Sequence, residues 1–152
     1  MSTKKEWLLA IMVIVGLTAC ATMQGGLKDI PLPNDINIVP PAPNLPKEIA
    51  AFSGKWEGTW DSGLDSILVV EEIHDTWAQV VFAHGDLRRY NYTANYERSK
   101  CKVISGPKPK IEAVPSIRDV SLMSFEVKDS NTLIGSMTGS TWKRSVIMKR
   151  VN

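Results

Sequence analysis

Histidine and cysteine are scarce in this sequence, which contains two of each among 152 residues. A metal site needs three or four ligands at suitable spacing, and none is recognisable around His74 and His84. Nucleophilic catalysis needs a nucleophile, a base and an orienting group, and no Gly-x-Ser-x-Gly turn is present. We therefore expect no catalytic residue, no metal and no cofactor. The two histidines are interpreted as exposed turn residues at strand ends, and an enzyme that uses either one is the third-ranked hypothesis.

The sequence also has no concentrated charge of one sign, with 18 basic and 16 acidic residues. A nucleic-acid-binding domain is expected to gather its basic residues on one face. A Gly-rich loop that could cradle a phosphate group is absent as well. The charge balance argues against nucleic acid as a partner.

A long hydrophobic run is the third absence. The longest uncharged apolar stretch, Trp7–Leu17, has about eleven residues, whereas a membrane-spanning helix needs about twenty. The positive charges of Lys4 and Lys5 precede it, and small residues follow it. This order of a short positive region, a short apolar region and small residues is typical of a secretory signal.

The residues that follow, Leu17-Thr18-Ala19-Cys20, resemble the lipobox of bacterial lipoproteins. In that family the cysteine thiol receives a diacylglyceryl group, and a peptidase cuts the chain before the cysteine. The resemblance implies that residues 1–19 are a signal peptide and that Cys20 is the lipid attachment site, with acyl chains holding the protein to a membrane. Because Ala21 and not Asp follows the cysteine, the resemblance favours the outer membrane, facing the periplasm.

Residues 20–50 contain a cluster of prolines, and we predict that they form a linker. Proline removes backbone donors and restricts φ, so this segment is not expected to form an ordinary helix or central strand. We expect an extended, polyproline-like spacer of about 3 Å per residue, with a short turn or helix near residues 44–48. The alternative left open is that part of the linker packs along the domain. The prolines are Pro31, Pro33, Pro40, Pro41, Pro43 and Pro46.

From residue 51 to residue 152 the sequence alternates short apolar and polar runs with turn residues between them. About one hundred residues suffice for one small domain. Many short strands joined by tight turns predict an all-β antiparallel meander, which usually closes into a barrel because closure removes exposed edges. We therefore predict a barrel of about eight strands. The expected strands are 54–60, 66–73, 77–84, 87–96, 101–104, 110–114, 120–128, 132–138 and 142–151.

The start of this domain, Gly54-Lys55-Trp56, resembles the Gly-x-Trp element of lipocalins and related calycins. In that family the Trp closes one end of the barrel, and a basic residue of the last strand packs across it. The resemblance implies that Gly54 and Trp56 close the barrel here, with Lys149 or Arg150 as the basic residue. Arg150 over Trp56 would add a cation–π contact of about 0.5–2 kcal/mol.

The predicted strand 87–96 places five side chains on one face: Arg88, Tyr90, Tyr92, Ala94 and Tyr96. We interpret its aromatic residues in two ways, as one wall of the core or as ligand contacts. The candidate ligand-binding residues are Trp60, Arg88, Tyr90, Tyr92 and Tyr96. Cys101 has no partner once Cys20 is acylated, and we expect it to be a buried strand thiol.

Two functions remain ahead of the enzyme hypothesis. The first is a membrane-anchored envelope lipoprotein whose lipocalin-like barrel binds a small apolar or amphipathic ligand. The second is a structural or interaction lipoprotein that contacts another component of the cell envelope and has no ligand cavity.

Overall fold

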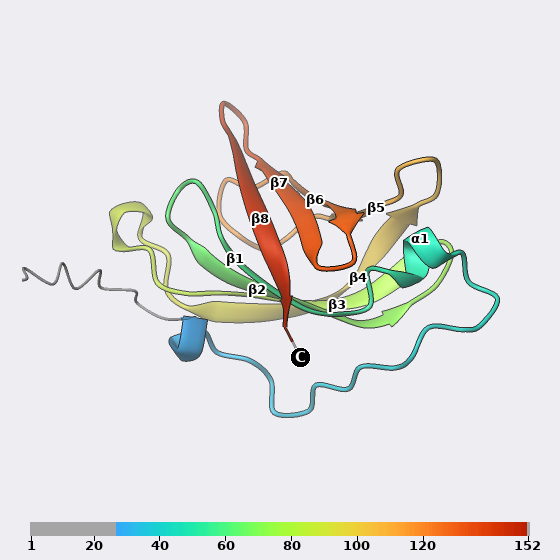
Figure 1. Ribbon diagram of the computed structural model, residues 1–152. Helices are drawn as coiled ribbons and strands as arrows, with labels where there is room; N and C mark the ends of the chain where they lie inside the picture. The colour runs from blue at the N-terminus through green and yellow to red at the C-terminus, as the bar shows by residue number, and fades with distance from the viewer. Residues whose placement is uncertain (1–26, 152) are drawn as a thin grey trace, which may run out of the picture.

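Alternating apolar and polar residues in the second half of the chain give an all-β structure, as predicted. The computed structural model describes residues 27–151, so the predicted signal peptide and Cys20 lie outside the described residues. Eight antiparallel strands pair in sequence order, and the last pairs with the first to close a barrel (Figure 1). The strands are β1 (Gly54–Thr59), β2 (Asp65–Ile73), β3 (Trp77–His84), β4 (Asn95–Ile104), β5 (Lys110–Ala113), β6 (Leu122–Asp129), β7 (Thr132–Thr138) and β8 (Lys143–Val151).

The prediction of a strand over residues 87–96 is wrong. Residues Arg88–Tyr90 form a short 3-10 helix, η2, and Asn91 follows it with φ 58°. Asparagine enters this left-handed region more readily than most residues, so the chain turns back at this point. Strand β4 begins only at Asn95 and continues to Ile104, which merges the predicted fifth strand into it. The alternation of tyrosines therefore reflects a folded loop and not a barrel wall.

The two ends of the barrel differ. Loops 60–64, 85–94, 114–121 and 139–142 surround one end, which we call the open end. The other end, which we call the closed end, carries the short helix α1 (Lys47–Ala50) and the loops 74–76, 105–109 and 130–131. Figure 1 shows the open end on the left and α1 on the right.

The interior of the barrel is filled by side chains. Trp56, Trp60, Leu68, Phe125 and Met148 are all buried in one continuous apolar core. A barrel of eight strands is just wide enough for side chains to fill it. The core thus leaves no room for a long ligand along the barrel axis.

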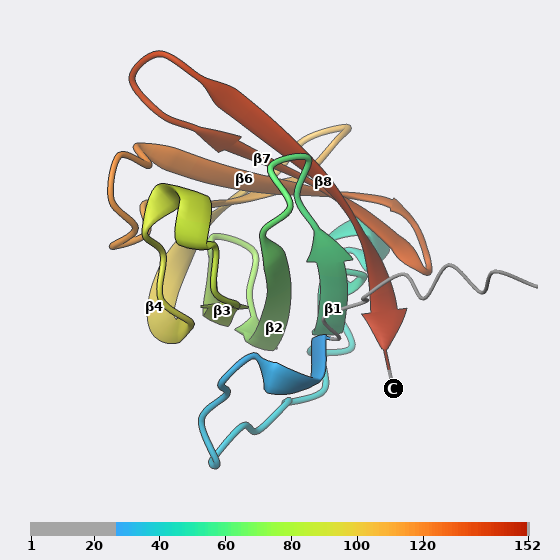
Figure 2. The same cartoon turned by 90° about the vertical axis from the view of Figure 1, so that its left-hand side faces the viewer.

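Strands β2 and β3 are buried on their outer face as well. Residues 27–46, which we call the strap, run along the barrel from the short 3-10 helix η1 (Leu27–Asp29) to α1 (Figures 1 and 2). Apolar side chains of the strap cover apolar side chains of the two strands. The strap contributes Leu27, Ile30, Leu32 and Ile36, and the strands contribute Ile67, Val69, Val81 and Ala83.

Burial on both faces explains why the centre of β2 reads Ile-Leu-Val-Val without a polar residue. Of the two arrangements left open for the proline-rich segment, packing against the domain is the one seen for the strap.

A polar cluster fastens the middle of the strap to the barrel wall. The guanidinium of Arg98 on β4 donates to Asp35 Oδ1 at 2.9 Å and pairs with Glu71 Oε2 at 2.9 Å. The backbone N–H of Val39 donates to the carbonyl of Glu71 at 2.7 Å. Hydrogen bonding to Arg98 holds the pKa of the Asp35 carboxyl below its usual range.

Strands β1 and β8 approach each other so closely at Gly58 that we predict no larger residue is tolerated there. A Cβ atom there would lie 2.7 Å from the carbonyl oxygen of Ile147 and 2.9 Å from Val146 Cγ2. We expect Gly58→Ala to lower the free energy of unfolding by about 1–3 kcal/mol, because backbone on β8 would have to move. Urea denaturation followed by circular dichroism measures this loss.

Gly85→Ala is the matched control, because the nearest heavy atom to its added Cβ would be 3.7 Å away. Equal unfolding free energies for the two variants would contradict the close approach of β1 and β8.

Candidate ligand site at the open end of the barrel

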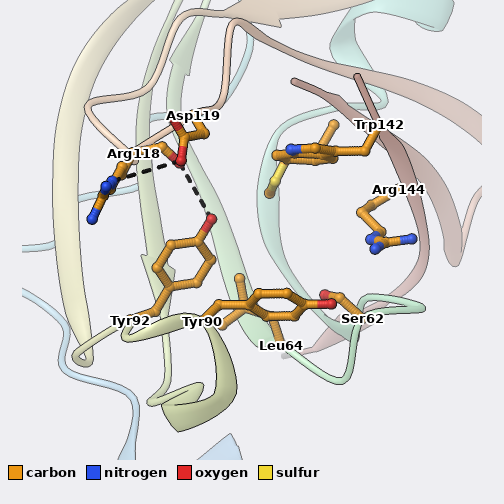
Figure 3. A pocket seen from close by; sticks show the side chains of 9 residues that line it. Ser62, Leu64, Tyr90, Tyr92, Arg118, Asp119, Trp142 and Arg144 are labelled. Carbon is orange, nitrogen blue, oxygen red and sulfur yellow. Dashed lines mark hydrogen bonds and ion pairs between the residues drawn. The ribbon is translucent and has the colours of Figure 1, made fainter. Parts of the chain in front are cut away.

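A cavity of about 200 Å³ opens between the loops at the open end (Figure 3). Its lining comes from all four of these loops and from the adjoining ends of β7 and β8. The lining residues are Ser62, Leu64, Tyr90, Tyr92, Arg118, Asp119, Met137, Trp142 and Arg144.

Apolar and aromatic side chains form the walls of this cavity. Leu64 and Met137 are buried and belong to the barrel core. Tyr92 and Trp142 pack against the same core while part of each stays exposed. A Cβ at Gly139 would collide with the indole of Trp142, so glycine lets this ring lie across the hairpin between β7 and β8.

Two arginines give the cavity its positive groups. Arg144 Nε lies 3.8 Å from Asp61 Oδ1, and Arg118 Nε lies 3.6 Å from Asp119 Oδ2. Both separations exceed the 2.7–3.2 Å of an N–H···O hydrogen bond. The guanidinium N–H groups can therefore donate to an anionic group that enters the cavity, since guanidinium suits carboxylate and phosphate.

A second cavity of about 180 Å³ adjoins the first, and both are lined by Tyr92 and Arg118. The Tyr92 hydroxyl donates to the carbonyl oxygen of Arg118 at 3.3 Å. Burial, and then the nearby charge of Asp119, raise the pKa of Tyr92. The phenol thus stays protonated at neutral pH. Its O–H remains on the Arg118 carbonyl oxygen, between the two cavities.

Neighbouring aromatic rings connect the barrel core to the open end. Successive ring centroids lie between 6.2 and 6.5 Å apart, within the usual range for aromatic pairs. This continuous packing gives the cavity wall a rigid support. The rings in order are Trp60, Phe125, Phe82, His84, Tyr92 and Tyr90.

The structure separates the five sequence-predicted ligand residues. Tyr90 and Tyr92 line the first cavity, and Tyr96 lines the second. Arg88 is exposed on η2 and lines neither cavity. Trp60 also lines neither, because it is buried in the core with its Nε1 donating to Ser66 Oγ at 2.8 Å.

Sequence reasoning missed Leu64, Arg118, Met137, Trp142 and Arg144. These residues belong to different hairpins and meet only when the barrel closes. The one local signal was Trp142, which lies two residues after the turn residues Gly139 and Ser140.

The expectation that both histidines are exposed turn residues is wrong for His84. It is the last residue of β3 and is only 8% exposed, with Nδ1 3.0 Å from the carbonyl oxygen of Gly85. His74 lies in a turn, stacks on Trp77 at 4.0 Å and pairs with Glu72 at 2.8 Å. Between residues 27 and 151, no group of three His, Cys, Asp or Glu side chains is placed to hold a metal ion.

The predicted barrel-closing residues Gly54, Trp56 and Arg150 meet at the closed end. The Arg150 guanidinium carbon lies 4.0 Å from the centre of a Trp56 ring. The guanidinium N–H groups of Arg150 donate to the carbonyl oxygens of Ala51, Ser53 and Ser130 at 2.6–2.8 Å.

Gly54 has φ +118°, and a Cβ there would lie 2.6 Å from Arg150 Nη1. Of the two basic candidates, Arg150 covers the indole, while Lys149 donates instead to Thr132 Oγ1 at 2.9 Å.

Cys101 is buried on β4 within the barrel core. Burial raises the pKa of its thiol. The expectation of a buried strand thiol is confirmed.

The chain matched no protein-family model, no curated protein and no solved structure. Across residues 27–151 the structure contains no helix with the length and apolarity needed to cross a bilayer.

The closed end yields a prediction that separates its two basic candidates. We expect Arg150→Met to lower the free energy of unfolding by about 2–4 kcal/mol, since it removes the cation–π contact and charged hydrogen bonds. Lys149→Met removes only the hydrogen bond to Thr132 and is expected to cost about 1 kcal/mol or less. Urea denaturation of both variants measures the difference, and equal losses would contradict the role of Arg150.

Proposed function

We propose that this protein is a lipid-anchored envelope protein whose barrel binds a small amphipathic molecule at its open end. The observation that carries the binding role is the cavity with aromatic walls and two arginines at the open end of a barrel whose interior is filled by side chains. The anchoring role rests on the resemblance of Leu17–Cys20 to a lipobox.

The size and lining of the cavity indicate the kind of ligand. Its 200 Å³ is below the range of about 300–1,000 Å³ for sites that enclose drug-sized ligands. Tyr90 and Trp142 suit a ring or short apolar chain, and Arg118 and Arg144 suit a carboxylate or phosphate. The proposed ligand is therefore a small anionic amphiphile, or the polar end of a larger one.

Native mass spectrometry of the full-length protein extracted gently from its membrane tests this proposal. We expect a bound small molecule on the wild-type chain. Arg144→Gln should reduce affinity about tenfold or more, since a charged hydrogen bond contributes about 1.5–3 kcal/mol. Trp142→Ala should also reduce affinity, because it removes an apolar wall of the cavity.

Arg88→Gln is the control for that experiment, because Arg88 lies at the same end but lines neither cavity. No bound molecule on the wild type, or an equal loss with Arg88→Gln, would contradict the proposed binding site.

A specific observation favours the second candidate, an interaction lipoprotein. Ile134 on β7 and Ile147 on β8 are direct register partners, and they are 42% and 63% exposed on the outer wall. Adjacent exposed apolar side chains of this kind can mark a protein-binding surface.

If this candidate is correct, cross-linking in intact cells captures one envelope protein at a stoichiometric ratio. Ile147→Ser should reduce this cross-link severalfold without changing the circular dichroism spectrum. A protein that is monomeric and uncross-linked in its membrane would exclude this candidate.

A further inference from the structure

The strap brings the N-terminal side of the domain to the open end of the barrel. Helix η1 packs against β2, and Ile30 Cγ1 lies 3.7 Å from the position that a Cβ of Gly85 would occupy. Gly85 begins loop 85–94, which borders the cavity. Figures 1 and 2 show η1 at this end of the barrel, with the strap leading away from it toward α1.

The length of chain before η1 limits how far the barrel can lie from an acylated Cys20. Only residues 21–26 separate Cys20 from Leu27, and at 3.3–3.6 Å per residue they reach at most about 25 Å. Residues 27–46 add nothing to this reach because they lie along the barrel. An anchor at Cys20 would therefore keep η1, and the open end beside it, within about 25 Å of the bilayer.

The rim of the open end has the chemistry of a membrane–water interface. Val114 is 73% exposed, Tyr90 46% and Tyr96 42%. Tyrosine and tryptophan favour the headgroup level of a bilayer, and arginine donates to phosphate. The rim arginines are Arg88, Arg89, Arg118 and Arg144.

Two acidic side chains in the loops of the same end accept hydrogen bonds from the backbone. Asp61 accepts from the backbone N–H of Ser145, and Asp86 accepts from that of Ala94. Asp119 Oδ2 lies 3.6 Å from Arg118 Nε, so Asp119 keeps a negative charge at the rim next to an arginine that can still donate.

The closed end contrasts with this rim. Among residues 27–151, none of the exposed large apolar side chains belongs to the loops at 74–76, 105–109 or 130–131, and the exposed Ile38 and Val39 lie on the strap beside β2, where Val39 pairs with Glu71.

We propose that the open end of the barrel lies on the phospholipid headgroup layer of the leaflet that carries the anchor. Tyr90, Tyr96 and Val114 then sit at headgroup level, and the rim arginines donate to lipid phosphates. This inference rests on the proposed acylation of Cys20. It deepens the proposed function, because the cavity then opens toward the lipid layer from which an amphipathic ligand would come.

Fluorescence quenching in vesicles tests the orientation. The full-length acylated protein is reconstituted into vesicles of phosphatidylethanolamine and phosphatidylglycerol that contain lipids with a nitroxide-labelled headgroup. A fluorophore is attached at Val114→Cys on the open end or at Lys108→Cys on the closed end, and both native residues are exposed. Unsubstituted protein gives the background from Cys101, which is buried.

We expect the label at position 114 to be quenched severalfold more than the label at position 108. Equal quenching, or stronger quenching at position 108, would overturn the proposed orientation.

Lengthening the segment before Leu27 tests whether the rim itself binds headgroups or is only held near them by the anchor. Twenty Gly and Ser residues are inserted between Gly26 and Leu27, and quenching at position 114 is measured again. Quenching that persists supports docking of the rim on headgroups, whereas a fall to the level at position 108 overturns it.

Mass spectrometry of the intact protein keeps the two proposals distinguishable. If the wild type carries no more lipid mass than a Cys20→Ser control, the anchor fails, and the anchoring part of the proposed function fails with it. If the wild type is acylated but the labels are quenched equally, only the orientation fails.

Discussion

The burial of β2 and β3 on both of their faces is the constraint on which the rest of the structure depends. A barrel wall is normally apolar toward the core and polar toward solvent, but here Ile67 and Val69 also point outward. Each such side chain contributes about 1.5–3 kcal/mol when it is removed from water. The strap removes them from water, so the proline-rich segment is part of the folded domain and not a spacer beside it.

This packing also determines at which end of the barrel the strap begins. Because the strap starts at the open end and finishes at α1, Leu27 lies beside the loops of the open end. Side chains fill the barrel interior, and the loops at one end form the cavity. A filled barrel with a shallow cavity can recognise part of a molecule at its rim without enclosing the whole molecule.

The sequence was sufficient for the fold class, because period-two alternation and turn residues are local signals. The bounds of β3 and β7 agree with the predicted ranges 77–84 and 132–138. Residues 87–96 were wrongly predicted as a strand because their aromatic residues alternate. Tyr92 packs against the core from a loop that covers the open end, and no strand is needed for that contact.

The cavity itself was only partly predictable. Tyr90 and Tyr92 were identified as aromatic residues in a polar stretch, but Trp142 and Arg144 join them from a hairpin about fifty residues away. That contact depends on how β7 and β8 close against β1, which no local pattern encodes. The burial of His84 has a more local origin, since its ring lies near Phe82 of the same strand and Tyr92 of the loop that follows.

The position of Cys101 has a practical consequence. Its sulfur is enclosed by the core, and burial keeps the thiol protonated, so alkylating reagents and oxidants meet neither an accessible nor a reactive group. Modification of this residue would therefore require β4 to separate from its neighbours β3 and β5. The rate at which a thiol reagent modifies Cys101 thus measures how often the barrel opens.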